Sequence, residues 1–210
     1  MSKEPAKSIV FIVDDDASMR QALARLFRSV DLEVEAFGST ADMLRHEFPD
    51  APSCLVLDVR LPGLSGLDFQ AELTRAGIKI PIIFMTGHGD VPMSVKAMKA
   101  GAVDFLTKPF RDQDMLDAVG LAIENDRKRR SGESAMTDVL ARFETLTARE
   151  REIMGLVTTG LMNKQVAAEV GLSLITVKIH RGHIMKKMHA RSLAELVRMA
   201  DALGIRRTQN

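Results

Sequence analysis

Acidic residues follow two apolar runs in the first half of the chain. Asp14, Asp15 and Asp16 come directly after "SIVFIV", and Asp58 ends "CLVLD" just before the loop "VRLPGLSG". Carboxylates that lie close together repel one another, and a hard cation such as Mg²⁺ relieves that repulsion. A carboxylate can also accept a phosphoryl group and become an acyl phosphate. The acids therefore predict phosphate chemistry at a magnesium site.

A hydroxyl and an amine follow two later apolar runs. Thr86 comes after "IPIIFM", and Lys108 comes after "VDFLT". The carboxyl ends of parallel strands meet at one edge of a sheet, where ligands bind. We therefore expect the hydroxyl and the amine to lie beside the acids and to contact a phosphoryl group. Asp58 is the expected acceptor, because it is a lone acid at a strand end beside an open loop.

Each feature has a simpler explanation when it is taken alone. The three aspartates are compatible with a solvated turn that caps the next helix, and Asp58 with an ordinary loop residue. Thr86 alone carries no functional information. The bond between Lys108 and Pro109 is a candidate cis peptide bond, as any bond before proline is. The arrival of these residues at successive strand ends is what favours the functional interpretation.

The elements that must position these residues alternate along the first half of the chain. Strand-length apolar runs are separated by segments with helical periodicity, and "LEVEAF" alternates apolar and polar residues as an edge strand does. Five strands interleaved with helices predict a parallel sheet covered on both faces. Gly77 and Gly101 follow two helical segments, where we expect left-handed C-caps.

Charge divides the chain into two regions. Residues 1–123 carry 13 basic and 18 acidic side chains, whereas residues 124–210 carry 16 basic and 10 acidic ones. This asymmetry predicts two domains with different partners, the basic one suited to nucleic acid. There is no membrane-length apolar run and no signal-peptide pattern, and the single Cys54 cannot form an internal disulfide. We expect a cytoplasmic protein without membrane contacts.

The second half shows only helical periodicity. We expect a partly helical linker at 124–142 and an all-α domain at 143–210. Thr147 and Glu150 have the spacing of a capping box. Two further helices follow, separated by a tight glycine turn with Ser173 as the cap of the second, and they form a helix-turn-helix candidate.

The last of these helices has two different faces. Residues at helical spacing are expected to pack inward, namely Val177, His180, Ile184 and Met188. The opposite face carries Lys178, Ile179, Gly182, His183 and Lys186. Residues 174–191 include five basic residues and no acid, which suits the major groove of DNA. A solvated cationic face on a structural helix stays open as the alternative, and His180 is expected to be a packed histidine.

At these motifs residues 8–123 resemble the receiver domain of two-component response regulators. "VDDD" is similar to the acidic pair of that family, "LDVRLPGLSG" to its phosphoacceptor loop, and "TGHGDVPMSVKAMKAGAVDFLTKPF" to the FixJ-type subfamily. The resemblance implies a doubly wound α/β receiver at 1–123, with a five-stranded parallel sheet of order 2-1-3-4-5. It implies these roles: Asp58 as phosphoacceptor; Asp15, Asp58 and the backbone carbonyl of Arg60, assisted by Asp14, as ligands of Mg²⁺ (or Mn²⁺); and Thr86, Phe105 and Lys108 as switch residues.

Residues 143–200 resemble the LuxR-type helix-turn-helix domain shared by NarL and FixJ regulators. "LTAREREIM", "GLMNKQVAAEVGLS" and "TVKIH" carry the likeness. It implies that the DNA contacts come from Thr176, Lys178, Ile179, Arg181, His183, Lys186 and Lys187. Gly182 departs from the pattern, because other members often carry a longer side chain there, so base recognition would rest on fewer residues.

The two resemblances together imply a DNA-binding transcriptional regulator and not an enzyme. Its expected reactions are self-phosphorylation from small donors and self-dephosphorylation. A histidine kinase is expected to phosphorylate Asp58, after which the face around residues 95–101 and Phe105 forms a homodimer that binds promoter DNA. RNA polymerase is a further expected partner.

Two alternatives stay open on the sequence. A phosphatase of the haloacid-dehalogenase type would use Asp14, Asp16, Thr86 and Lys108, although it leaves Asp58 idle and the second half unexplained. The other is a protein-binding regulator whose basic domain never contacts DNA.

Overall fold

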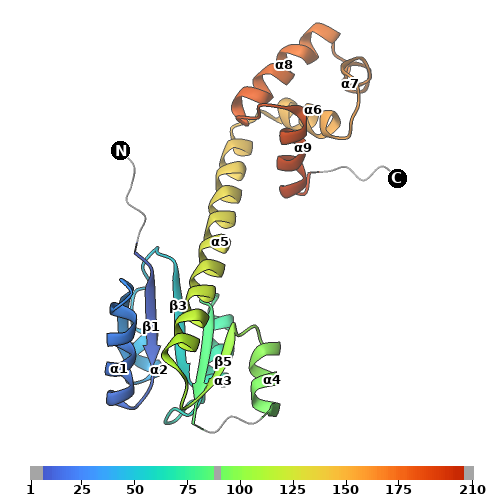
Figure 1. The fold of residues 1–210 in the computed structure, drawn as a ribbon. Coiled ribbons are helices and arrows are strands. Elements are labelled where there is room, and N and C mark those ends of the chain that lie inside the picture. The colour runs from blue at the N-terminus through green and yellow to red at the C-terminus, as the bar shows by residue number, and fades with distance from the viewer. Residues whose placement is uncertain (1–6, 88–90, 206–210) are drawn as a thin grey trace. The chain divides into compact units, whose positions relative to one another are not determined.

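The structure is a computed structural model that describes residues 7–87 and 91–205 (Figure 1). The chain divides into two compact units, residues 1–130 and 131–210. This division falls inside the segment 124–142, where the sequence predicts a linker. Among the described residues, no helix combines the length and the hydrophobicity that a membrane span requires. The first residues, on which the signal-peptide expectation depends, lie outside the described ranges.

A five-stranded parallel sheet organises the first unit. Its order is β2-β1-β3-β4-β5, which confirms the expected topology. The strands are β1 (Ile9–Val13), β2 (Glu33–Phe37), β3 (Ser53–Asp58), β4 (Ile82–Thr86) and β5 (Asp104–Thr107). Every residue of β1, β3 and β4 is buried, as expected for apolar strands inside a doubly covered sheet. β2 lies at an edge, as its alternating pattern predicts.

Helices cover both faces of the sheet. They are α1 (Ala17–Arg28), α2 (Thr40–Leu44), α3 (Gly66–Arg75), α4 (Val91–Lys99) and α5 (Asp112–Glu144). In β1, Val10 and Ile12 pack in a core with residues of α1 and α5, while Phe11 and Val13 pack in a core with residues of α2, α3 and α4. A shift of one residue would exchange the two faces, so this alternation fixes the register of the strand.

The helix ends follow the glycine pattern, and the helix lengths differ from expectation in two places. Gly77 and Gly101 follow α3 and α4 with φ angles of 71° and 92°, the expected left-handed conformation. α2 has only five residues, which are too few to show helical periodicity in the sequence, so the sequence does not predict this helix. The segment 124–142, expected to be a partly helical linker, is helical throughout, because α5 runs without interruption to Glu144.

The second unit is all-α, as predicted. After α5 come α6 (Ala148–Thr158), α7 (Asn163–Val170), α8 (Leu174–Lys187) and α9 (Leu193–Ala202). Thr147 and Glu150 form the expected capping box, and Ser173 caps α8 by accepting from the backbone N–H of Thr176. Gly171, with φ of 65°, ends α7. The sequence pattern predicts α9 only as part of a helical region and not as a separate element.

Candidate functional site

The carboxyl ends of β1 and β3 bring three acids together. Asp14, Asp15 and Asp58 each offer one carboxylate oxygen, and these oxygens lie within 4.8 Å of one another. The strand register explains the meeting, since Val13 pairs with Leu57 and the next residues of both strands emerge side by side. Asp14 is fully buried, Asp15 is exposed, and Asp58 is 7% exposed. The cluster is therefore anchored inside the protein and open to solvent on one side.

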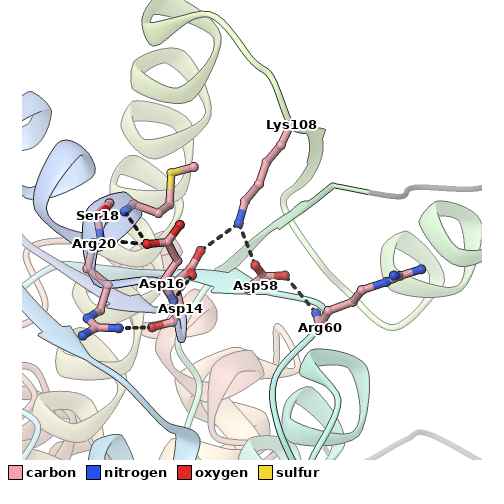
Figure 2. A network of polar contacts seen from close by, with 8 residues as sticks. Asp14, Asp16, Ser18, Arg20, Asp58, Arg60 and Lys108 are labelled. Atoms are coloured by element: carbon pink, nitrogen blue, oxygen red, sulfur yellow. Dashed lines mark hydrogen bonds and ion pairs between the residues drawn. The ribbon is translucent and has the colours of Figure 1, made fainter.

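Lys108 joins the two buried carboxylates, as Figure 2 shows. Its Nζ donates to Oδ2 of Asp14 at 2.8 Å and to Oδ2 of Asp58 at 2.6 Å. Burial acts to lower the pKa of Lys108, but the hydrogen bonds and charges of the two aspartates outweigh it, and the pKa is raised. Lys108 is therefore an ammonium group that offsets the repulsion between the acids. A cis peptide bond joins it to Pro109.

Backbone N–H groups hold the same carboxylates in place (Figure 2). Oδ1 of Asp58 accepts from the amide of Arg60 at 2.8 Å, and Oδ1 of Asp14 accepts from the amide of Asp16 at 2.8 Å. The guanidinium of Arg20 donates to the carbonyl oxygen of Asp14 at 2.6 Å. Asp16 itself caps α1. The capping explanation of the three aspartates is thus correct for the third one, while the first two belong to the cluster.

The expected switch residues Thr86 and Phe105 lie on β4, which is next to β3, and on β5, which is next to β4. Thr86 is the last residue of β4 and is fully buried, and its carbonyl oxygen accepts from the amide of Lys108 at 2.7 Å. Phe105 of β5 is half-buried, with its ring centroid 6.3 Å from that of Phe84. It packs against the core that includes Ala97 of α4. The strand that leads to Lys108 is therefore in contact with the core under α4.

Gly66 is a residue of this site that the sequence analysis missed. A Cβ atom at this position would lie 2.5 Å from the carbonyl oxygen of Asp58 and 3.0 Å from Cα of Val59. Its amide donates to the carbonyl oxygen of Val59 at 2.9 Å. Only glycine lets α3 begin this close to the backbone of Asp58. The available signal was a glycine directly after Ser65, the helix cap.

In the second unit, α8 presents the two faces that the sequence predicts. Val177, Ile184 and Met188 are fully buried. His180 is half-buried, and its Nδ1 atom is buried without a hydrogen-bond partner among the residues that the structure describes. The residues expected on the opposite face, Lys178, Ile179, Gly182, His183 and Lys186, are all exposed, and so are Leu174 and Ile175 in the first turn. The exposed face is cationic with an apolar part.

Three of the residues expected to contact DNA form hydrogen bonds inside the second unit, and Nδ1 of His183 lies 3.9 Å from Oε1 of Glu150. The hydrogen bonds are Thr176 Oγ1 to Ser173 Oγ (2.8 Å), Arg181 Nη1 to Asn163 Oδ1 (2.6 Å) and Lys187 Nζ to Glu150 Oε2 (2.7 Å). Glu150 is buried, which by itself raises its pKa, but hydrogen bonds from Lys187 and Thr147 outweigh this, and the pKa of Glu150 is lowered. An ionised carboxylate at the start of α6 therefore holds the end of α8.

Comparison with known proteins matches each unit to a family. The response regulator receiver domain model matches residues 10–120, and the model of bacterial regulatory proteins of the luxR family matches residues 144–200. Nodulation protein W of Bradyrhizobium diazoefficiens is 66% identical over 199 residues, which cover 95% of this chain and 88% of that protein. This chain belongs to the FixJ/NarL family of response regulators. The regulator is also 42% identical to FixJ of Azorhizobium caulinodans over 201 residues, covering 96% of this chain and 95% of that protein.

Solved structures agree with this assignment. The response regulator StyR superposes with a TM-score of 0.84 at 46% identity, covering 93% of this chain and 99% of that one. The regulator therefore combines a receiver with a LuxR-type DNA-binding domain and is a two-component transcriptional regulator. This architecture implies a histidine kinase and promoter DNA as partners. The family excludes the phosphatase alternative, and the LuxR-type match contradicts a basic domain that never contacts DNA.

The donor set of the acid cluster fits the Mg²⁺ that receiver domains bind in their acidic pocket. Three carboxylate oxygens lie close enough to share one ion, and hard oxygen donors are those that Mg²⁺ prefers. Asp15 is exposed, so water molecules can complete the coordination shell on that side. The fit rests on the chemistry of the donors and on their spacing.

Proposed function

We propose that phosphorylation of Asp58 switches this regulator. The observation that carries the proposal is the setting of the Asp58 carboxylate. Nζ of Lys108 donates to one of its oxygens at 2.6 Å, and the amide of Arg60 donates to the other at 2.8 Å. The carboxylate is fixed in position and remains 7% exposed at the open side of the cluster. A phosphoryl donor can reach it there.

The transfer requires no chemistry beyond substitution at phosphorus. A carboxylate oxygen of Asp58 forms a bond to the phosphorus of a kinase phosphohistidine or of a small acyl phosphate. The bond to the leaving group breaks with its electron pair, and water protonates the leaving group. Mg²⁺, or Mn²⁺, would neutralise charge on the phosphoryl group in transfer. Attack by water on the same phosphorus restores the free carboxylate, which is self-dephosphorylation.

We assign the other pocket residues as follows. Asp15, Asp58 and the backbone carbonyl of Arg60 would hold the ion, and Asp14 would assist them. Lys108 exchanges its bond with Asp58 for one with a phosphoryl oxygen, because the new group brings about −1.5 to −2 charges. The hydroxyl of Thr86 donates to another phosphoryl oxygen.

Movement of Thr86 toward the phosphoryl group lets Phe105 repack and shifts a two-state equilibrium at α4. α4 exposes Val91, Val95 and Met98 at positions i, i+4 and i+7, which form one apolar stripe on the helix surface. A second copy of the phosphorylated chain covers this stripe, and the homodimer places two DNA-binding domains on neighbouring half-sites.

The exposed face of α8 contacts DNA. Lys178, Ile179 and His183 face bases, and Lys186 faces phosphate. Thr176, Arg181 and Lys187 complete the contact set, and their contacts within the domain also fix the position of α8. The bound dimer then contacts RNA polymerase, and the regulator acts in the cytoplasm, where the DNA is. Lys178→Ala should relax the base preference of binding, whereas Lys186→Ala should weaken binding to all sequences and lower its salt dependence by about one unit of slope.

The acceptor assignment is tested by intact-mass measurement after incubation with Mg²⁺ and a small acyl phosphate. One phosphoryl group on the wild type and none on Asp58→Asn is the expected result. Equal modification of both proteins would place the acceptor elsewhere. Asp16→Asn is a matched control, because Asp16 caps α1 and should not be needed for uptake.

A further inference from the structure

An apolar stripe lies within the cationic face of α8. Ile175 is 72% exposed and Ile179 is 53% exposed. Together with Gly182 they occupy positions i, i+4 and i+7, which lie along one side of a helix. Among the large hydrophobic residues that the structure describes, Val91 alone is more exposed than Ile175. Both isoleucine side chains therefore lie mostly outside the packed interior of the domain.

Gly182 is not required by the fold. A Cβ atom there would meet nothing within 4 Å, and the backbone conformation is the ordinary helical one. A glycine inside a helix is less favourable than alanine, so packing gives no reason for it. Its effect is to leave the helix surface flat beside Ile179, where another molecule can approach the helix closely.

The surroundings of the stripe indicate what covers it. Lys178 and Lys186 are exposed on the same helix, and residues 174–191 contain no acid. A partner must therefore combine negative charge at the borders with apolar groups in the middle. The major groove of DNA has phosphates at its borders, and thymine is the base that presents a methyl group there.

We propose that Ile175 and Ile179 read the C5-methyl groups of two thymines in each half-site. This inference rests on the DNA-binding function of the domain. Four residues of helix advance about 6 Å, and base pairs are spaced about 3.4 Å apart. The two thymines therefore lie about two base-pair steps apart. Gly182 admits the close approach of the helix that such methyl contacts need.

The test removes single methyl groups from DNA. The phosphorylated full-length chain first selects a duplex from a random-sequence pool, and each thymine of that duplex is then replaced by deoxyuridine. Deoxyuridine keeps every hydrogen-bonding group and lacks only the methyl. Burial of one such group contributes about 0.8 kcal/mol, so each of two substitutions should weaken binding about fourfold.

Protein variants then assign each methyl group to a side chain. Ile175→Ala should abolish the deoxyuridine effect at one thymine, and Ile179→Ala at the other. A control variant should keep both effects: Leu121→Ala removes a similarly exposed side chain (55%) from α5. Both isoleucines are exposed, so the variants should fold as the wild type does.

Other results would overturn the inference in distinguishable ways. If a sequence is selected but deoxyuridine has no effect, or its effects persist in both isoleucine variants, only the thymine assignment fails. If Ile175→Ala dissociates an oligomer of the DNA-free chain, the stripe is a protein interface. If no sequence is enriched, the DNA-binding function fails together with the inference.

Discussion

Replacement of Gly66 with alanine should destabilise the receiver and displace Asp58. The added Cβ would lie 2.5 Å from the carbonyl oxygen of Asp58, about 0.9 Å short of ordinary van der Waals contact. The opposing atoms belong to the backbone, so a change of side-chain rotamer cannot relieve the contact. Overpacking of this kind costs about 1–3 kcal/mol. The end of β3 must move, and the Asp58 carboxylate then loses its 2.6 Å contact with Lys108.

Gly120 in α5 provides a matched control within the same domain. It is an exposed helical glycine, and a Cβ there meets nothing within 4 Å. Gly120→Ala should therefore stabilise the receiver by about 0.5–1 kcal/mol. Calorimetry of the full chain measures both effects. The unfolding transition of the receiver is the one whose Tm shifts when Mg²⁺ is added. At roughly 4 °C per kcal/mol, Gly66→Ala should lower this Tm by about 4–12 °C, and Gly120→Ala should raise it by about 2–4 °C.

The same pair of variants separates stability from function. Gly66→Ala should also accept phosphoryl groups more slowly from a small donor at a temperature where it is still folded, whereas Gly120→Ala should react as the wild type does. The reasoning is refuted if Gly66→Ala unfolds at the wild-type temperature and is phosphorylated at the wild-type rate. The start of α3 would then not constrain the acceptor.

Lys108→Met leaves the buried Asp14 carboxylate without its ammonium partner. Without Mg²⁺, the free energy of unfolding of the receiver should therefore fall by about 3 kcal/mol, and Mg²⁺ should raise the Tm of this variant more than that of the wild type. Equal Mg²⁺ shifts in both proteins would contradict this. The pKa of Glu150 is lowered on folding, so its contribution is present at neutral pH and is lost as the pH falls below its ordinary 4.5 through the folded-state pKa. Glu150→Gln should flatten the acid side of the Tm–pH curve of the second unit, and an unchanged slope would exclude that role. Ser173→Ala should cost about 1 kcal/mol by removing the cap of α8, while Ser173→Asp should keep it; equal thermal stability of both variants would contradict the capping role.

The pocket of the receiver could be predicted because its residues follow strand ends. Asp14, Asp58 and Lys108 are placed by the sheet, and the alternation of strands and helices predicts a parallel sheet without any structure. The strand order came from the resemblance to receivers. The inward face of α8 could also be predicted, because helical spacing alone separates Val177 and Ile184 from the exposed residues.

What the sequence could not show depends on contacts between distant segments. α2 is too short to display a period. The need for Gly66 arises only when α3 meets the backbone of Asp58, and its one local signal is a glycine directly after the helix cap Ser65. The ion pair of Lys187 with Glu150 joins residues 37 positions apart, so an expected DNA contact proved to have a partner inside the domain.

The coupling between phosphorylation and DNA binding is tested by comparing promoter-DNA affinity before and after phosphorylation. The wild type and Asp58→Asn are each titrated into the selected duplex, with and without prior treatment with Mg²⁺ and a small acyl phosphate. We expect treatment to tighten DNA binding by the wild type, to lower its dimer dissociation constant and to leave Asp58→Asn unchanged. If the wild type carries the phosphoryl group on Asp58 and binds DNA no more tightly, or if Asp58→Asn responds equally, the coupling proposed here is wrong.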